Sequence, residues 1–494
     1  MALSVTTGAY GQKANDTLRI AFETEVDTLD MYFTTLRQTY IMSQLVYDTL
    51  VYRHPETGAY SGLLAESWER IDDQTLEFRL RQGVTFHNGE PFNADDVVHT
   101  LNHMIAPDSG IRTVRNVGWI ASVERVDDYT VRVNSDGPFP PALEYLSGPV
   151  VIYPDEYYAE VGPERFGVAP VGTGPYRVTE IVPGQRFEFE RNEDYHAASP
   201  KGRPDIGRIV ARTIPDANTR LAELLSGGLD WIWRLPTDQA ERIEPDDDFR
   251  LVNAETMRIG FVYLDAAGRT GDDNPLTDVR VRRAIIHAID REAIVDNLIG
   301  GASEVVHAAC YPSQFGCEQD VARYAYDPER ARALLAEAGY PEGFEIRFGA
   351  YAERTGVEAM AAYLEAVGIT VNFNFNRYAA VRELIHGDEM PMAQRSWGSY
   401  SINDVSAITS AFFKHSQDDF ARDDDVLNWL EVADTTADEE ARLENYSKAL
   451  QRIADQAYWI PTWTFNRWYM FSSDLDFTPT VDELQHFYRA RWVD

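Results

Sequence analysis

The segment LEFRLRQGVTFHNGEPFNADDVVHTLNHM, residues 76–104, joins an alternating strand pattern to an amphipathic helix through a short turn. Asn88 and Gly89 form a dipeptide that favours tight turns, because both residue types tolerate a positive φ angle. Asn93 is predicted to cap the helix, since its side chain can accept hydrogen bonds from the first backbone N–H groups. Apolar residues then recur every three to four positions, as on the buried face of a helix. The segment therefore predicts a strand, a turn and a helix in succession.

Histidines in this segment also allow a chemical interpretation. His87 lies close to Glu90, a pairing that could serve acid–base chemistry, and His99 and His103 stand one helical turn apart, as two metal ligands would. A histidine pair without a third ligand on a solvated helix face is nevertheless common in proteins that bind no metal. We therefore predict that these histidines belong to the scaffold.

The composition is that of a large acidic protein. Its 494 residues are 44% hydrophobic, which is enough for two or three domains with their own cores. The chain has 80 acidic against 45 basic residues and a net charge of −35, so we do not expect it to bind nucleic acid. No apolar run approaches the ~18 residues of a membrane-spanning helix, so no membrane span is expected. A lysine-poor, acidic surface suits a salty or extracytoplasmic setting.

Two cysteines, Cys310 and Cys317, enclose the segment YPSQFG, whose proline and glycine suit a tight loop. A disulfide across this loop is predicted, with two separate thiols as the alternative. Such a bond would indicate an oxidising compartment. The first residues, MALSVTTGAYGQKAND, read like the end of a signal peptide, with QKA before Asn15 as a candidate cleavage site. We therefore expect an exported protein whose signal peptide is largely missing from this sequence.

Strand and helix patterns alternate along the chain without internal repeats or a low-complexity linker. Residues 172–192 predict a β-hairpin with Gly184 near its turn, and residues 278–299 predict one long helix. Trp231 and Trp233 alternate along a predicted strand and therefore share one face. The alternation indicates an α/β fold with mixed sheets.

The sequence lacks the short motifs of common enzyme classes. It contains no G-x-S-x-G, H-E-x-x-H or G-x-x-x-x-G-K-[ST] motif, and GTGPYR at 172–177 lacks the third glycine of a dinucleotide-binding loop. It also has no Cys/His cluster with metal-ligand spacing, so neither a metal site nor a cofactor is predicted. A binding protein is therefore favoured over an enzyme, with a hydrolase of no recognisable motif as the alternative.

A set of motifs follows one order along nearly the whole chain. They are DTLD (27–30), LAESWE (64–69), LEFRLRQGVTFHNGEPFNADDV (76–97), PVGTGPYRV (170–178), GGLDWIW (227–233), PLTDVRVRRAIIHAIDREAIV (275–295), YDPERARALLAEAGYPEGFEI (326–346) and YWIPTW (458–463). Together they resemble family 5 of the extracytoplasmic solute-binding proteins, which serve peptide, nickel and opine ABC importers. The resemblance implies that His87 and its neighbours form a turn and a helix cap.

The resemblance implies a two-lobed periplasmic-binding-protein fold, with an accessory subdomain in lobe I and a ligand cleft between the lobes. Carried onto this chain, the parts are a lobe I core of residues 15–50, 171–257 and 470–494, an accessory subdomain of residues 51–170, and a lobe II of residues 258–469. The implied function is the substrate-binding component of an ABC importer. It would capture a small solute by lobe closure and dock transiently on a membrane permease. Such a protein would be a periplasmic monomer and not an enzyme.

The resemblance also implies where ligand contacts lie, above all in QRSWGSYSINDV (394–405). Peptide-binding members carry an aspartate three residues after the tryptophan, where this chain has Tyr400, and the nearest carboxylate is Asp404. Arg395 and Trp397 belong to an Arg-x-Trp-Gly pattern that resembles nickel- and metallophore-binding members. The histidine of those members, eighteen residues after the tryptophan, corresponds to His415. The arginine that they carry in the strand at 146–154 is missing here.

Five further residues are predicted to line the ligand site, although large aromatic residues also fill protein cores. They are Tyr32, Arg37 and Tyr40 after the first strand, Trp233 on its strand, and Trp119 in the accessory subdomain. Because Tyr400 replaces the acid that would hold an α-amino group, we do not expect a plain oligopeptide. Arg395 could hold a ligand carboxylate in a bidentate pair. The expected ligand is therefore a zwitterionic or carboxylate-bearing solute, such as a modified peptide or an opine, with a nickel chelate or metallophore as the alternative.

Overall fold

The computed structural model describes residues 15–244 and 247–493, which form two compact units. Unit 1 comprises the residues up to Ala254 and from Arg467 onward, and unit 2 is Glu255–Asn466. These limits lie close to the predicted lobe boundaries at residues 257 and 469, while the accessory subdomain within lobe I stays a prediction. The candidate signal-peptide remnant, residues 1–14, lies outside the described residues.

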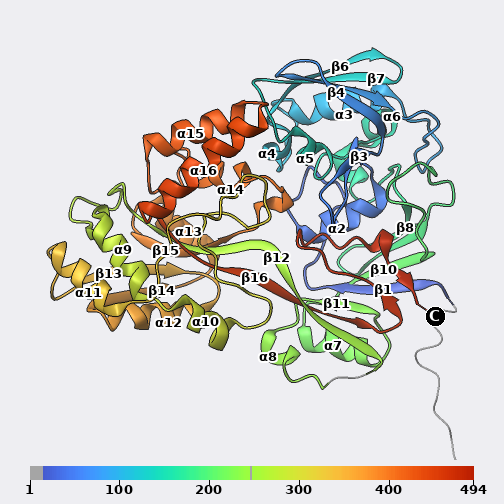
Figure 1. The fold of residues 1–494 in the computed structure, drawn as a ribbon. Helices are drawn as coiled ribbons and strands as arrows, with labels where there is room; N and C mark the ends of the chain where they lie inside the picture. The colour runs from blue at the N-terminus through green and yellow to red at the C-terminus, as the bar shows by residue number, and fades with distance from the viewer. Residues whose placement is uncertain (1–14, 245–246, 494) are drawn as a thin grey trace, which may run out of the picture. The chain divides into compact units, whose positions relative to one another are not determined.

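Unit 1 is built on a mixed sheet (Figure 1). Its strands are β1 (Thr17–Phe22), β8 (Tyr176–Val182), β9 (Arg186–Arg191), β10 (Arg208–Thr213), β11 (Trp231–Trp233) and the end of β16 (Trp459–Ser472). Their order is β16-β11-β1-β10-β9-β8, and β1 pairs in parallel with both β10 and β11. The predicted hairpin is confirmed, because β8 and β9 pair across Gly184, whose φ of 70° suits glycine. Trp231 and Trp233 share a face as predicted, with ring centroids 6.0 Å apart.

A second sheet in unit 1 has the antiparallel order β4-β5-β7-β6, and its strand β5 is the predicted strand, which the predicted turn and helix follow along the chain. Its strands are β4 (Ala65–Arg70), β5 (Thr75–Leu80), β6 (Ile120–Asp127) and β7 (Thr130–Ser135). Two small pairs join β2 (Val51–Arg53) to β3 (Tyr60–Gly62) and β17 (Leu475–Asp476) to β18 (Arg491–Trp492). The helices are α2 (Arg37–Val46), α3 (Ala94–Ile105), α4 (Val114–Val117), α5 (Ala142–Leu146), α6 (Asp155–Phe166), α7 (Ala217–Leu225) and α8 (Thr237–Ala240).

The predicted helix cap is confirmed, and the scaffold role of His87 stays a prediction. Asn93 begins α3 with a complete capping box: its side chain accepts from the Asp95 N–H, and its own N–H donates to the Asp96 carboxylate at 2.8 Å. The His87 ring lies against a neighbouring loop, with Nε2 2.9 Å from the carbonyl oxygen of Gly174. Burial lowers the pKa of His87 to about 4, so the ring is neutral at pH 7.

Unit 2 has helices on both faces of one mixed sheet (Figure 1). The strand order is β14-β13-β15-β12-β16, and β13 pairs in parallel with β14 and β15. The strands are β12 (Phe249–Leu264), β13 (Phe344–Ala350), β14 (Ile369–Phe375) and β15 (Met392–Trp397). Successive side chains of a strand point to opposite faces. Accordingly, Phe261 and Tyr263 of β12 enter one core, and Val262 and Leu264 enter the other.

The helices of unit 2 divide between these two cores. On the Val262 side lie α9 (Val279–Ala288), α10 (Arg291–Ile294), α11 (Pro328–Glu337) and α12 (Arg354–Glu365). On the Phe261 side lie α13 (Tyr378–His386), α14 (Ser406–Phe412), α15 (Asp424–Thr435) and α16 (Glu439–Asp455).

The prediction of one long helix over residues 278–299 is wrong. The helix α9 ends at Ala288, and the backbone of Ile289 is extended. The side chain of Asp290 then accepts a hydrogen bond from the Ala293 N–H at 2.9 Å and caps the start of α10. A capping residue inside an apolar pattern therefore breaks the helix in two.

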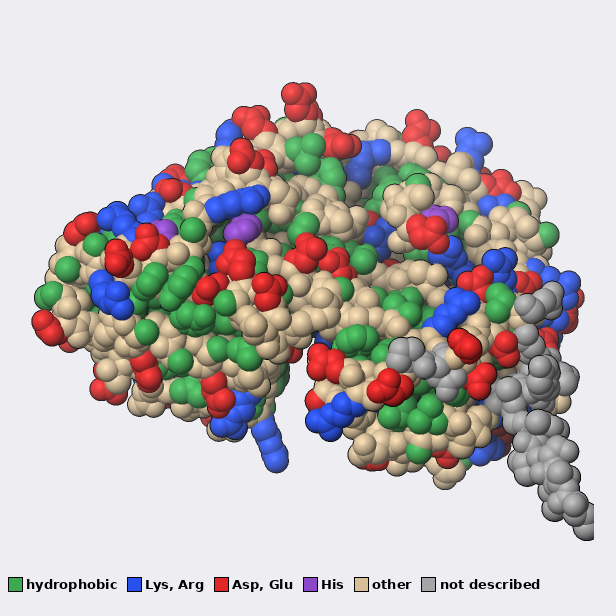
Figure 2. Space-filling model, turned by 60° about the horizontal axis from the view of Figure 1, so that its bottom comes forward, with side chains coloured by type: hydrophobic (Ala, Val, Ile, Leu, Met, Phe, Trp, Pro, Cys, Tyr) green, Lys and Arg blue, Asp and Glu red, His purple; other side chains and the backbone are tan. Residues whose placement is uncertain are grey.

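The predicted disulfide between Cys310 and Cys317 is confirmed, with an S–S distance of 2.02 Å. No helix among the described residues has the length and apolar character needed to cross a bilayer. Acidic and basic side chains are interspersed over the face drawn in Figure 2. Positive charge is therefore not concentrated there, as expected from the net charge of −35.

Candidate functional site

Each unit contains three adjacent parallel strands, and the residues that directly follow them are the candidate site residues of that unit. In α/β sheets, ligands bind beyond the carboxyl ends of parallel strands, where loops diverge and leave room. In unit 1, Glu23 follows β1 and Arg234 follows β11, and in unit 2 Tyr351 follows β13 and Gly398 follows β15. We call these places the carboxyl edge of unit 1 and the carboxyl edge of unit 2.

Glu23 organises the carboxyl edge of unit 1. Its Oε2 accepts a hydrogen bond from Trp233 Nε1 at 2.9 Å. Its Oε1 accepts from Gln38 Nε2 at 2.9 Å and from Arg234 Nη1 at 2.7 Å. The Arg234 guanidinium also lies over the Trp233 ring, 4.4 Å from its centroid. One carboxylate thus connects two neighbouring strands to the start of α2.

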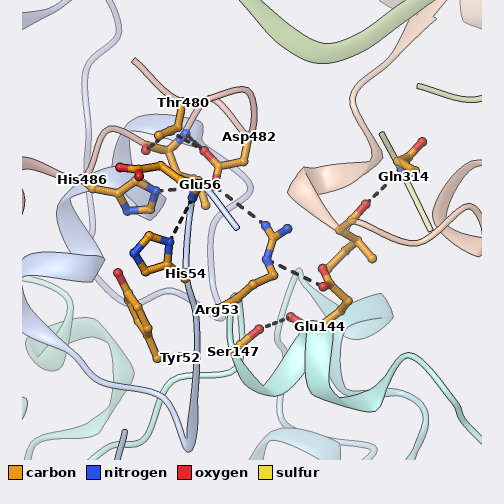
Figure 3. Close-up of polar contacts among 12 residues, drawn as sticks. Tyr52, Arg53, His54, Glu56, Glu144, Ser147, Gln314, Thr480, Asp482 and His486 are labelled. Carbon is orange, nitrogen blue, oxygen red and sulfur yellow. Dashed lines mark hydrogen bonds and ion pairs between the residues drawn. The ribbon is translucent and has the colours of Figure 1, made fainter. Parts of the chain in front are cut away.

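A second set of charges in unit 1 surrounds Arg53 (Figure 3). Arg53 lies between two carboxylates, with Nε 3.7 Å from Glu144 Oε1 and Nη2 3.8 Å from Asp482 Oδ2. Asp482 also accepts from Thr480 Oγ1 at 2.6 Å and lies 3.5 Å from His486 Nε2. Burial alone would raise the pKa of Asp482, but His486 and Arg53 hold it well below its ordinary value. Asp482 is therefore a carboxylate at neutral pH.

Two predicted site residues of α2 belong to the same surroundings. Arg37 Nη1 donates to the backbone oxygen of Asp482 at 3.2 Å. The charges of Arg37, Asp482 and Arg53 all act on the Tyr40 hydroxyl, whose pKa is raised by burial. A Cβ atom on Gly148, in the segment 146–154 that lacks the arginine of nickel-binding members, would lie 2.6 Å from the Tyr40 oxygen. We call the whole set the unit 1 charge cluster: Glu23, Arg37, Arg53, Glu144, Arg234 and Asp482.

The carboxyl edge of unit 2 is aromatic. The rings of Trp397 and Tyr400 meet edge to face with centroids 5.1 Å apart, and Tyr400 is 47% exposed. Next to them the Ser396 N–H donates to the Tyr351 hydroxyl at 3.2 Å, and Arg258 Nη1 donates to Ser396 Oγ at 3.3 Å. This edge can therefore cover an apolar or cationic part of a ligand and offers one guanidinium beside it.

The segment Gly398–Val405, which we call the site loop, has an unusual backbone. Ser399, Tyr400 and Ser401 have φ angles of 49°, 50° and 68° in succession. This left-handed conformation costs a non-glycine residue roughly 1–3 kcal/mol and persists only where surrounding contacts enforce it. Strain of this kind is concentrated at functional sites, which supports a functional role for the loop.

Two predicted ligand residues in unit 2 already have partners of opposite charge. Arg395 is 5% exposed and its Nη1 lies 2.7 Å from Asp418. Asp404 is 3% exposed and its Oδ2 lies 2.7 Å from Arg442 Nη2. Their ligand roles stay predictions, but both charges are balanced within the protein.

Three other predicted site residues lie in different surroundings. Tyr32 is fully buried, and its hydroxyl donates to the Val151 carbonyl at 2.6 Å. Trp119 stacks on Phe139 with ring centroids 4.7 Å apart. His415 lies in the loop after α14, with a φ of 53°. The structure therefore brings Arg37 and Tyr40 together beside Asp482, places Trp233 beside Glu23, and brings Trp397 and Tyr400 together in unit 2.

Sequence reasoning missed most of the charged members of the unit 1 charge cluster. Glu23 and Arg234 directly follow predicted strands, and that position is a signal that could have found them. Arg53, Glu144 and Asp482 are far apart in the chain, so no local pattern connects them.

Comparisons with known proteins agree with this architecture. Residues 59–420 match the family model described as bacterial extracellular solute-binding proteins, family 5 Middle. Heme-binding protein A of Haemophilus influenzae is 28% identical over 462 residues, which cover 85% of this chain and 81% of that protein. A putative ABC transporter peptide-binding protein of Brucella ovis is 30% identical over 325 residues, which cover 63% of this chain and 59% of that protein.

Solved structures share the fold along the chain. HbpA2 from Haemophilus parasuis has a TM-score of 0.84 at 25% identity, over 97% of this chain and 100% of that chain. The dipeptide-binding protein of Pseudoalteromonas sp. SM9913 has a TM-score of 0.78 at 23% identity, over the same shares. These neighbours confirm the predicted two-lobed periplasmic-binding-protein fold. Because the family model covers well over half of the residues and the motifs occur in the family's order, the chain belongs to the bacterial extracellular solute-binding proteins of family 5.

Proposed function

We propose that this protein captures a small zwitterionic solute, such as a modified peptide or an opine, outside the cytoplasmic membrane. The observation that carries the proposal is the unit 1 charge cluster, in which Arg53 lies between the carboxylates of Glu144 and Asp482, and Glu23 pairs with Arg234. A zwitterion can place its carboxylate on an arginine and its ammonium on a carboxylate, and thereby satisfy both kinds of group.

The aromatic carboxyl edge of unit 2 would bind the remainder of the solute. Tyr400 presents an exposed ring beside Trp397. A cation over such a ring gains about 0.5–2 kcal/mol, and apolar groups gain from burial against it. The absence of an acid at position 400 supports a ligand other than a plain oligopeptide.

Ligands of similar proteins support this chemistry. Structures with related folds hold Met-Leu, agropinic acid and Ni(L-His). All three contain a carboxyl group, which a guanidinium binds with two parallel hydrogen bonds. A nickel chelate is the second candidate from sequence, and its binding is one outcome of the test below.

The proposal includes the partners and location expected from sequence. The protein would act in the periplasm as a monomer without a cofactor, close its two units on the solute, and dock transiently on an ABC permease. It would release the solute unchanged, whereas a hydrolase would consume it.

Thermal unfolding with a panel of solutes tests the proposal. The panel contains Met-Leu, an opine, glutathione, Ni(L-His) and a neutral disaccharide. A ligand at 100 times its Kd stabilises the folded state by about 2.7 kcal/mol, which raises Tm measurably. We expect a shift with a zwitterion, no turnover of that solute by mass spectrometry, and a smaller shift in Glu23→Gln. Glu358→Gln, which alters an exposed ion pair on α12, is the matched control. A shift with only the disaccharide would refute the zwitterion, and a shift with only Ni(L-His) would favour the nickel chelate.

A further inference from the structure

We propose that the Cys310–Cys317 disulfide positions the solute-binding aromatic edge of unit 2, by holding the site loop in its strained conformation. The inference rests on the proposed function only in so far as Trp397 and Tyr400 contact the solute. The segment between the cysteines, which we call the disulfide loop, lies directly against the site loop, with Phe315 bridged in parallel to Asp404.

Backbone and side-chain hydrogen bonds join the two loops. The Phe315 N–H donates to the Asn403 carbonyl at 3.1 Å, and the Val405 N–H donates back to the Phe315 carbonyl at 3.0 Å. Gln314 Nε2 donates to the Ile402 carbonyl at 3.0 Å. Gln314 is 4% exposed, so its hydrogen bond to the site loop is shielded from competing water.

A buried ion pair also supports the contact between the disulfide loop and the site loop. The Phe315 ring covers the Arg442 guanidinium, 4.7 Å from ring centroid to Cζ, and that guanidinium pairs with Asp404 of the site loop. A Cβ atom on Gly316 would lie 2.5 Å from Tyr446 Cδ2, so the disulfide loop packs too closely for any side chain there. Contacts with Arg442 and with Tyr446 therefore fix the position of the disulfide loop.

The strained residues need such support. Ser399, Tyr400 and Ser401 directly precede the segment that the disulfide loop binds. If residues 402–405 were free to move, the three residues could relax to ordinary φ angles and Tyr400 would turn away from Trp397. The disulfide limits the conformations of the loop that holds residues 402–405, because it fixes both of its ends.

Hydrogen exchange in the full chain tests this without a known ligand. The amide protons of Phe315 and Val405 report the contact between the loops directly. In the double variant Cys310→Ser/Cys317→Ser, we expect these amides to exchange at least tenfold faster, while amides in the β13–β14 pair keep their rates. Gln314→Ala should produce a similar change. The control variant Gln319→Ala should not, because Gln319 is exposed and its hydrogen bond goes to Cys317 Sγ rather than to the site loop. Unchanged exchange at Phe315 and Val405 would overturn the proposal.

A panel solute that raises the Tm of the wild-type protein then serves as the ligand. Its affinity for the variants tests whether the disulfide affects solute binding. We expect the double variant and Gln314→Ala to lose at least tenfold in affinity, and Gln319→Ala to keep it. Faster exchange with unaltered affinity would overturn the positioning role, although the contact would stand. If no panel solute binds the wild-type protein, the proposed function fails, and the exchange rates still decide whether the disulfide holds the site loop.

Discussion

Removing the Asp404 carboxylate should destabilise unit 2 far more than removing a surface carboxylate that lies at the same distance from its own basic partner. Asp404 Oδ2 lies 2.7 Å from Arg442 Nη2, and side chains of both residues are less than a tenth exposed. Asp404 Oδ1 also accepts hydrogen bonds from the Ser406 N–H at 3.0 Å and from Ser406 Oγ at 2.6 Å. The carboxylate is thus the anchor of the site loop.

The expected loss follows from burial. In Asp404→Ala the Arg442 guanidinium stays buried without its counter-charge, which typically costs about 3–5 kcal/mol. The Glu444–Lys448 pair on α16 has the same 2.7 Å distance, but its side chains are 63% and 44% exposed. Glu444→Ala should therefore cost only about 0.2–0.5 kcal/mol, as exposed helix pairs do. The two variants differ in burial and not in distance.

Urea unfolding measures both losses. The hydrogen exchange of the β13 amides is the signal, so that unit 2 alone is reported. The double variant Asp404→Ala/Arg442→Met, which also removes the guanidinium that Asp404→Ala leaves without its carboxylate, should recover part of the stability that Asp404→Ala loses. Equal losses for Asp404→Ala and Glu444→Ala would refute this reasoning, as would an Asp404→Ala loss below about 1 kcal/mol.

Three further predictions concern unfolding as a function of pH and redox state. Burial raises the pKa of Asp30 from 3.8 to about 6, so the free energy of unfolding should fall as pH rises from about 4 to 6. Asp30→Asn should lose this slope in pH-dependent urea unfolding. Burial lowers the pKa of His87 from 6.5 to about 4. The free energy of unfolding that the neutral ring contributes is therefore lost as pH falls from about 6.5 to about 4, the opposite sign to Asp30. His87→Gln should remove that second slope, and unaltered slopes in either variant would contradict the assignment. Cys310→Ser/Cys317→Ser should lose about 2–3 kcal/mol, the loop-closure value for so short a loop, and a loss below 0.5 kcal/mol would contradict it.

Features with a local cause could be predicted from the sequence. The capping box at Asn93, the hairpin at Gly184 and the disulfide each depend on residues within a short segment. The one clear failure among helices, at Asp290, was also local, since aspartate before Arg-Glu-Ala is itself a helix-start signal. The apolar periodicity on both sides concealed it.

Charge partners could not be predicted, because they depend on tertiary contacts. Arg395 was expected to bind a ligand carboxylate, yet the chain supplies Asp418 from a loop beyond α14. Arg53 pairs with Asp482, which is more than four hundred residues away. Neither pairing leaves a periodic or compositional signal near the arginine.

The acidic composition affects which arginines of this chain are candidates for binding a ligand carboxylate. With 80 carboxylates against 45 basic side chains, an arginine that becomes buried has many internal partners available. Burial of a guanidinium without partners is costly. Arg395 and Arg442 each have a carboxylate of the protein beside them. The buried Arg220, Arg282 and Arg291 instead donate to backbone carbonyl oxygens. A ligand carboxylate would have to compete with those partners. An arginine between two carboxylates is a better candidate, because the carboxylate of a zwitterionic solute can bind the arginine while the ammonium group of the solute binds one of the two acids. Arg53 lies between Glu144 and Asp482 and meets that condition, whereas the carboxylate beside Arg395 is that of Asp418.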